Sequence, residues 1–317
     1  MTSIELNDTS NALFNVALFA YVAAMVASFA FLAFRARALA WLSTAIGIGG
    51  LVANVAALVT RGLAAERFPW GNMYEYSMAM SIVVVAAYRL GVELRFRIRT
   101  LGGPVYAFVV FTLAIASLFF YVAAGPLLPA LNSYWRQIHV TSMITATSLL
   151  GIGSVLTILY LLKDLTERRG VARLRAQAPP PISGGAIETD VPEDYVPADD
   201  ELPAPAREPR SGRLPSAATL DRLAYRFIAF GFPIWTFGVI GGAIWAQEAW
   251  GRYWGWDPKE TWSFITWVIF AGYLHARATS GWKGRPAAVV ALVGFASLLV
   301  TYYAVNLWIP GLHSYST

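Results

Sequence analysis

The 317-residue sequence contains no cysteine and only three histidines. Without cysteine the chain has no disulfide bond, no thiolate metal ligand and no thiol nucleophile. Any thiol or redox chemistry must therefore come from a cofactor or a partner. Charged residues are also scarce, at 14% of the chain against about 25% in an average soluble domain.

Long apolar runs make up much of the sequence. The chain is 57% hydrophobic and its mean hydropathy is +0.52. Eight runs have about the length that a helix needs to cross a hydrocarbon core of ~30 Å. The sequence therefore predicts an all-α, polytopic membrane protein with about eight transmembrane helices, at 13–34, 41–60, 74–91, 104–124, 139–162, 223–246, 260–277 and 286–307.

The distribution of Lys and Arg predicts the orientation of these spans. If the N-terminus lies outside, 19 of the 24 basic residues fall in inside loops or at inside span ends, and five fall outside. Because basic residues concentrate in cytoplasmic loops, an N-out, C-out topology is expected. The same loops account for the net charge of +5, so no nucleic-acid partner is needed.

Residues 164–221 differ in composition from the rest of the chain. They hold most of the proline and acidic residues and few large apolar side chains. Such a segment cannot bury enough surface to offset its ordering entropy. We therefore expect a disordered cytoplasmic loop at 164–221 between a five-helix membrane half, 1–163, and a three-helix half, 222–317.

The three histidines divide between the two membrane faces. His139 opens the fifth span and His313 follows the eighth, both at the external side. His275 lies 15 residues after Glu260, which is ~22 Å inward at ~1.5 Å per residue. A lone histidine at a membrane edge is usually an ordinary surface or capping residue. Two external imidazoles can nevertheless clamp a metal from opposite sides, and His275 is too deep to join them.

Tryptophan is crowded into one predicted external loop, where four indoles fall within thirteen positions, namely Trp250, Trp254, Trp256 and Trp262. Interfacial tryptophans ordinarily form a scattered membrane belt, which explains Trp41, Trp282 and Trp308. The belt explains the crowded loop poorly, because Gly251 and Gly255 let the backbone bend and gather the indoles. The following residues suit a helix start, with Asp257 as N-cap, Pro258 in the first turn and Glu260 at the positive helix end.

An aromatic platform beneath two histidines suits one class of ligand. A planar, mostly apolar macrocycle with a central metal matches both features, and haem is such a ligand. Iron held by two histidines is coordinatively saturated. Asp257 is expected to be a helix cap or a partner to Arg252 rather than an acid or base.

At this point several segments resemble a known family. The chain is similar to the WWD family of haem-handling membrane proteins, and within it to the CcsA (ResC) group of the second cytochrome c biogenesis system. The likeness covers nearly all of the transmembrane chain and leaves out 164–221. Its motifs are WGRYWGWDPKE (250–260), SYWRQIHV (133–140), GYLHAR (272–277), GWKGR (281–285), GLHSY (311–315) and FPWGNMYEYS (68–77). The last of these is expected to line the external site.

The resemblance implies a set of haem contacts. His139 and His313 correspond to external axial ligands of the haem iron, and His275 to one ligand of an inner, transmembrane site. Haem b is the implied cargo. The signature residues that would contact it are Trp250, Trp254, Trp256 and Asp257.

The resemblance also implies partners and a location. The second inner ligand would come from a CcsB/ResB-type membrane subunit, because the first five spans hold no histidine besides His139. The implied activity is haem export across the bacterial cytoplasmic membrane and covalent attachment to the Cys-x-x-Cys-His segment of apocytochrome c at the extracytoplasmic face. The chain would be one subunit of a cytochrome c haem lyase, and thiol-reducing proteins are further partners.

Other functions remain open at the level of sequence. One is a CcmC-like or CcmF-like haem-handling protein of another maturation system. A second is a b-type haem redox protein with permanently fixed ligands. A third, a solute transporter, is disfavoured because ionisable residues within the spans are few, with Glu75 and Glu93 near span ends.

Overall fold

The structure is a computed structural model that describes residues 2–126, 133–177 and 214–312. Within these ranges the chain forms helices and no strand. The elements are α1 (Ser3–Phe34), α2 (Arg37–Ala64), α3 (Met73–Ala87), the π-helix η1 (Tyr88–Leu94), α4 (Gly102–Phe119), α5 (Tyr134–Gln177), α6 (Ala217–Trp250), α7 (Pro258–Thr279), α8 (Arg285–Leu299), the π-helix η3 (Val300–Ala304) and α9 (Val305–Leu307). The predicted all-α membrane fold is confirmed.

The eight predicted spans all form helices. Seven of them are long and apolar enough to cross a membrane, and the span at 260–277 forms α7, a helix of 22 residues. The third predicted span contains a buried charge, Arg89 of η1. The bundle accommodates this guanidinium because it pairs with Glu93 and donates to the carbonyl of Ser43. The N-out, C-out orientation stays a prediction.

The ends of the 164–221 segment are helical rather than disordered. Helix α5 continues to Gln177 and α6 begins at Ala217, while 178–213 lie outside the described residues. Ion pairs at i,i+4 spacing support the extension, one between Lys163 and Glu167 and one between Asp164 and Arg168. Asp164 also pairs with Arg285, which joins the extension to α8.

Helix α5 is shared by two hydrophobic cores. One core lies mainly among α1 to α5 and includes Ile152 and Leu156 of α5. The other lies among α5 to α8 and includes Ala146 and Leu150 of α5. The two cores therefore pack against different faces of α5, and this shared helix fixes the two halves of the bundle relative to each other.

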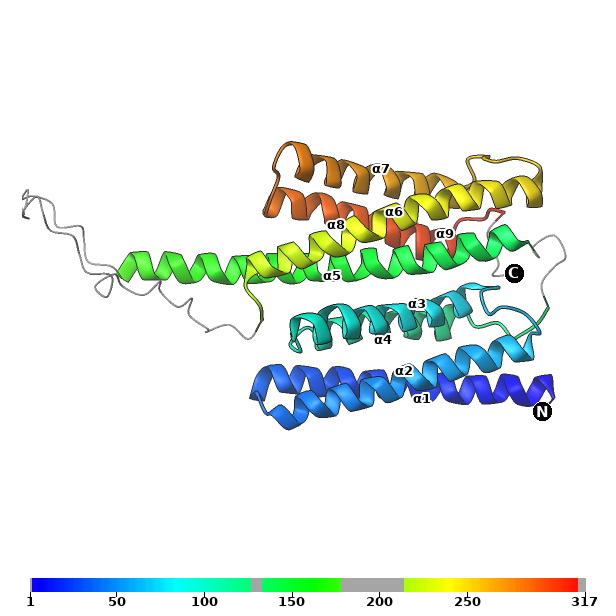
Figure 1. Cartoon of the computed structure of the whole chain (residues 1–317), viewed down its shortest axis with the longest axis horizontal. Helices are drawn as coiled ribbons and strands as arrows, with labels where there is room; N and C mark the ends of the chain where they lie inside the picture. Colours follow the sequence, from blue (N-terminus) through cyan, green and yellow to red (C-terminus); the bar gives the residue numbers. More distant parts are fainter. Residues whose placement is uncertain (1, 127–132, 178–213, 313–317) are drawn as a thin grey trace, which may run out of the picture.

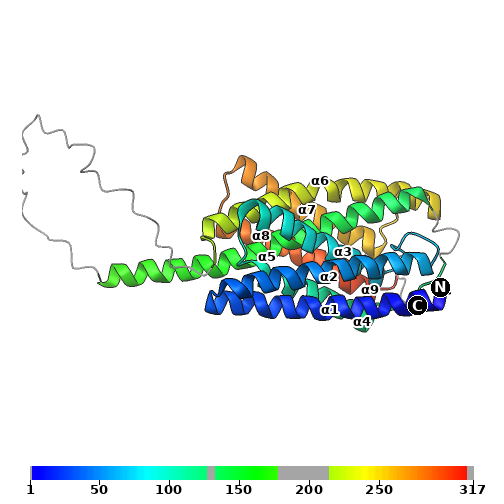
Figure 2. The ribbon, with the colours of Figure 1, turned by 60° about the horizontal axis from the view of Figure 1, so that its bottom comes forward.

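The segments that carry three of the sequence motifs, at 68–77, 133–140 and 250–260, gather at one end of the bundle (Figure 1). The first turn of α1, the loop between α6 and α7, and α9 all lie toward that end, and α5 extends beyond the other helices at the opposite end (Figures 1 and 2). The start of α3 lies near the same end as the α6–α7 loop (Figure 1). Segments from both halves of the sequence are thus placed to form a common site.

A buried ionic cluster fixes the start of α3 at this end. The Glu75 carboxylate accepts hydrogen bonds from Arg61 Nε at 3.0 Å and from Arg67 Nη1 at 2.8 Å, and Arg61 and Glu75 are both fully buried. Glu75 also accepts from the Gly71 amide at 2.6 Å, and Asn72 caps α3. The cluster therefore holds residues 67–73 against α3.

Candidate functional site

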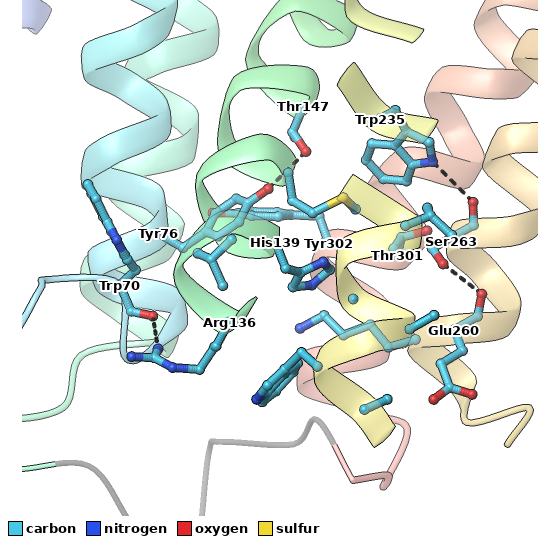
Figure 3. A pocket seen from close by; sticks show the side chains of 18 of the residues that line it. Trp70, Tyr76, Arg136, His139, Thr147, Trp235, Glu260, Ser263, Thr301 and Tyr302 are labelled. Carbon is cyan, nitrogen blue, oxygen red and sulfur yellow. Dashed lines mark hydrogen bonds between the residues drawn. The ribbon is translucent and has the colours of Figure 1, made fainter. Parts of the chain in front are cut away.

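A cavity opens at the end of the bundle that carries these three motifs. The space between its lining residues is about 1120 Å³ when the solvent in its open mouth is counted. Segments that are distant in sequence line it, and His139 lies between Trp70 on one side and Glu260 on the other (Figure 3). The lining comprises Trp70–Met73 and Tyr76; Arg136, His139, Val140, Met143 and Thr147; Trp235, Val239, Gly242, Ala243, Trp245 and Ala246; Tyr253, Trp254, Lys259, Glu260 and Ser263; and Leu298, Thr301 and Tyr302.

The imidazole of His139 is held in a defined orientation in this cavity. Its Nδ1 lies 2.7 Å from the carbonyl oxygen of Gly238, so Nδ1 carries the proton and donates. Nε2 is then the basic nitrogen, and a histidine whose other nitrogen donates to a carbonyl is the usual form of a metal ligand. The ring also stacks on Trp245, with centroids 6.0 Å apart and an interplanar angle of 22°.

A glycine on α6 makes room for this ring. A Cβ placed on Gly242 would lie 2.6 Å from His139 Nδ1, closer than real Cβ contacts allow. At the preceding residue, Gly241, the nearest atom of His139 would be 3.7 Å away, an ordinary contact. The position of the His139 ring against α6 therefore depends on Gly242.

The Trp-rich loop is folded around the carboxylate of Glu260. Glu260 Oε2 accepts from the Gly255 amide at 2.8 Å and from the Asp257 amide at 3.2 Å. Asp257 caps α7 and forms a capping box with Glu260, with Pro258 in the first turn. The predicted cap is confirmed, and the ion pair of Arg252 is with Glu260, at 4.0 Å, rather than with Asp257.

The predicted site residues separate into four groups. His139 and Trp254 line the cavity. Trp250 packs against Trp245, with centroids 5.1 Å apart, Trp256 is 66% exposed, and Asp257 is a buried cap; none of these three lines the cavity. His275 is exposed near the far end of α7. His313 lies outside the described residues.

Most of the aromatic wall comes from residues outside the Trp-rich loop. Trp70 and Tyr76 belong to the FPWGNMYEYS segment, which lines the cavity as predicted. Trp235 and Trp245 on α6 were not singled out from the sequence. The signal for them is helical spacing, because the lining residues Trp235, Val239, Gly242 and Ala246 recur at intervals of four, three and four along one face of α6.

Two cations lie in this mainly apolar lining. Arg136 is buried and donates from Nη1 to the Trp70 carbonyl at 2.9 Å. Lys259, which precedes the predicted span at 260–277, donates to Asn306 Oδ1 at 2.9 Å, and burial lowers the pKa of its ammonium to about 8. The arrangement suits a flat apolar ligand that bears negative charge at an edge.

The bundle and its aromatic cavity define the class of the protein, a polytopic helical membrane protein with an open aromatic cavity at one end. The comparisons with known proteins then identify the family. Residues 70–313 match the family described as Cytochrome C assembly protein. The chain belongs to this family, and the resemblance to the CcsA group is confirmed.

Two curated relatives illustrate the similarity. The cytochrome c biogenesis protein CcsA of Gloeobacter violaceus is 36% identical, over 88% of this chain and 91% of the relative. That of Synechococcus elongatus is 38% identical, over 86% and 87% respectively. A role in cytochrome c assembly follows from this family membership.

A solved structure shares the fold. The chain is similar to the cytochrome c haem lyase CcmF with a TM-score of 0.63 and 15% sequence identity. The similarity covers 96% of this chain and 47% of that longer chain. At this identity the likeness establishes a common arrangement of helices.

Proposed function

We propose that the cavity binds haem b as a substrate and presents it to apocytochrome c at the extracytoplasmic face of the bacterial cytoplasmic membrane. The observation that carries the proposal is the His139 imidazole, oriented by Gly238 and stacked on Trp245 in the lining of an open, aromatic cavity. The signature residue Trp254 lines the same cavity. Arg136 and Lys259 supply positive charge that suits the propionates of the ligand.

The axial ligands of the iron would be His139 and His313. His313 directly follows Leu312, whose amide is hydrogen-bonded to Asp257 at the N-terminus of α7. Both α7 and α5 contribute side chains to the cavity, and the tether of Leu312 to α7 supports the assignment of His313 as the second ligand. In this proposal Trp250, Trp256 and Asp257 stabilise the Trp-rich loop, and Trp254 is the signature residue that contacts the ligand.

A second, inner site would be centred on His275. This residue is exposed near the end of α7 that is farther from the cavity, so a ligand from another chain can reach the same iron. We propose that this ligand is a histidine of a CcsB/ResB-type subunit. Haem would load there and move outward to His139, which makes the chain the exporting subunit.

The reaction at the cavity requires positioning rather than a protein nucleophile. Two thiols of a Cys-x-x-Cys-His segment add across the two vinyl groups of haem. Each addition forms one C–S and one C–H bond and breaks one S–H bond and one π bond, so no oxidant is consumed. Thiol-reducing proteins keep the substrate thiols reduced, because this chain has no cysteine. Fixing the parts at close distance supplies most of the rate increase.

The test is loss and rescue of the His139 ligand. In His139→Ala, purified with its partner subunit, we expect roughly tenfold weaker haem retention and a matching loss of cytochrome c maturation. Added imidazole should restore part of both, because it fills the vacant axial position. Wild-type haem content in His139→Ala would contradict the proposal.

A second measurement separates the proposal from a b-type redox protein. Wild-type complex loaded with haem is incubated with a reduced Cys-x-x-Cys-His peptide, and the product is analysed by mass spectrometry. We expect haem to leave the complex covalently attached to the peptide. Haem that stays bound while it cycles between oxidation states would favour electron transfer instead.

A further inference from the structure

We propose that Asp257 is a positioning residue that ties the Trp-rich loop to the C-terminal segment of the chain, an inference that rests on the proposed function. Its carboxylate is buried and its two oxygens serve different segments. Oδ2 accepts from the Lys259 amide of α7 at 3.4 Å, and Oδ1 accepts from the Leu312 amide at 2.9 Å, 55 residues further along the chain.

The ordinary role of Asp257, a helix cap, leaves half of this arrangement unexplained. A cap needs a single side-chain oxygen, and serine serves as well as aspartate. The second oxygen of Asp257 is used on a residue that belongs to no helix. A carboxylate can accept from both amides at once with a different oxygen for each, which lets it bridge two segments.

The packing of the neighbouring glycine supports the contact independently. A Cβ on Gly311 would lie 2.7 Å from Asp257 Oδ1 and 3.3 Å from its Cγ. The backbone therefore approaches the carboxylate as closely as a glycine permits. A second link joins the same regions, because Lys259 at the start of α7 donates to Asn306 of α9.

The consequence concerns the residue that comes next. Leu312, which Asp257 holds, is the residue that immediately precedes His313 in the sequence. In the proposed function His313 is an axial ligand. Asp257 would thus lower the entropy that is lost when His313 binds iron, without touching the porphyrin itself.

Two substitutions separate this tether from the cap. Asp257→Ser keeps a capping oxygen but has no second one for Leu312. Gly311→Ala leaves Asp257 intact and displaces the segment from the other side. We expect hydrogen–deuterium exchange of the C-terminal peptide to be roughly tenfold faster in both variants, with the thermal midpoint of the full chain little changed. Unchanged exchange in both would overturn the tether, and this arm needs no haem.

The haem arm then asks whether the tether acts through His313. Haem affinity is measured for Asp257→Ser, His313→Ala and the double variant in the complex with the partner subunit. We expect Asp257→Ser to weaken binding roughly tenfold, to be rescued by imidazole, and to add nothing in the His313→Ala background. Equal losses in both backgrounds would show that Asp257 acts elsewhere. A His313→Ala complex that binds like the wild type would refute the ligand assignment of the proposed function, while the exchange arm still decides the tether.

Discussion

Gly242 is the residue on which the orientation of His139 depends most directly. We predict that Gly242→Ala lowers haem retention roughly tenfold, because its Cβ would lie 2.6 Å from Nδ1 and would displace the ring from Gly238. Gly241→Ala is the matched control, since its Cβ would meet His139 only at ordinary contact distance. The measurement is the Soret absorbance per purified complex. Equal loss in the two variants would indicate a general effect on helix packing.

Two of the three tryptophans of the signature, Trp254 and Trp256, are expected to differ in importance. Trp254 lines the cavity, whereas Trp256 is 66% exposed and has a left-handed backbone with φ of 57°. We predict that Trp254→Ala reduces haem occupancy several-fold, because the indole offers a flat aromatic surface to a planar ligand in the cavity. Trp256→Ala should have a smaller effect.

Trp308 serves as the control for membrane anchoring, because it is 77% exposed and lies outside the cavity lining. Haem occupancy of Trp308→Ala should match the wild type. If Trp254→Ala and Trp308→Ala lost haem equally, the tryptophans would act as an interfacial belt. Comparing Trp254→Ala with Trp308→Ala therefore distinguishes a ligand-binding role of the Trp-rich loop from a membrane-anchoring role.

At the scale of single elements, the start of α3 depends on a buried ionic cluster. We predict that Glu75→Gln destabilises the protein by about 3–5 kcal/mol, because Arg61 and Arg67 would lose their common carboxylate in a buried setting. Thermal unfolding followed by tryptophan fluorescence measures the change. Glu66→Gln, in the same connection but exposed, should leave the midpoint unchanged. Equal midpoints for both variants would show that the cluster contributes no net stability.

The length of a helix could be predicted where an apolar run determines it. It could not be predicted where ion pairs extend the helix beyond that run. The apolar runs gave the eight spans, but the fifth was expected at 139–162 and α5 extends from Tyr134 to Gln177. A hydropathy profile does not predict this extension, because charged residues hold it in place. Asp164 pairs with Arg168 in the same helix and with Arg285 of α8. Likewise, no local pattern links Arg61 to Glu75, because the partners meet only when α2 and α3 pack.

The site was predicted in part for a similar reason. His139 and Trp254 were found because rare residues in a crowded motif stand out in the sequence. The walls from α6 were not, since Trp235 and Trp245 look like ordinary residues of an apolar span until α5 packs against them. Trp256 and Asp257 share the motif but do not line the cavity, and a spacing pattern does not distinguish loop support from ligand contact.

At the scale of the whole molecule, the absence of cysteine allows a direct test of topology. We predict that a Glu66→Cys variant reacts with a membrane-impermeant maleimide on intact cells, because Glu66 is exposed near the cavity end of the bundle. Arg169→Cys, on the exposed extension of α5, should react only after permeabilisation. The wild-type chain gives a blank. The opposite labelling pattern would reverse the predicted orientation and move the cavity to the cytoplasmic face.

The sharing of α5 between two cores constrains how cargo can pass. In a rocker-type transporter two rigid bundles tilt against each other, which requires a seam with few apolar contacts. Here such tilting would break the apolar contacts that α5 makes with one of the two cores. These contacts involve Ile152 and Leu156 in one core, and Ala146 and Leu150 in the other. We therefore expect turnover to proceed by small displacements of the Trp-rich loop and of side chains at the rim, over a frame that stays still.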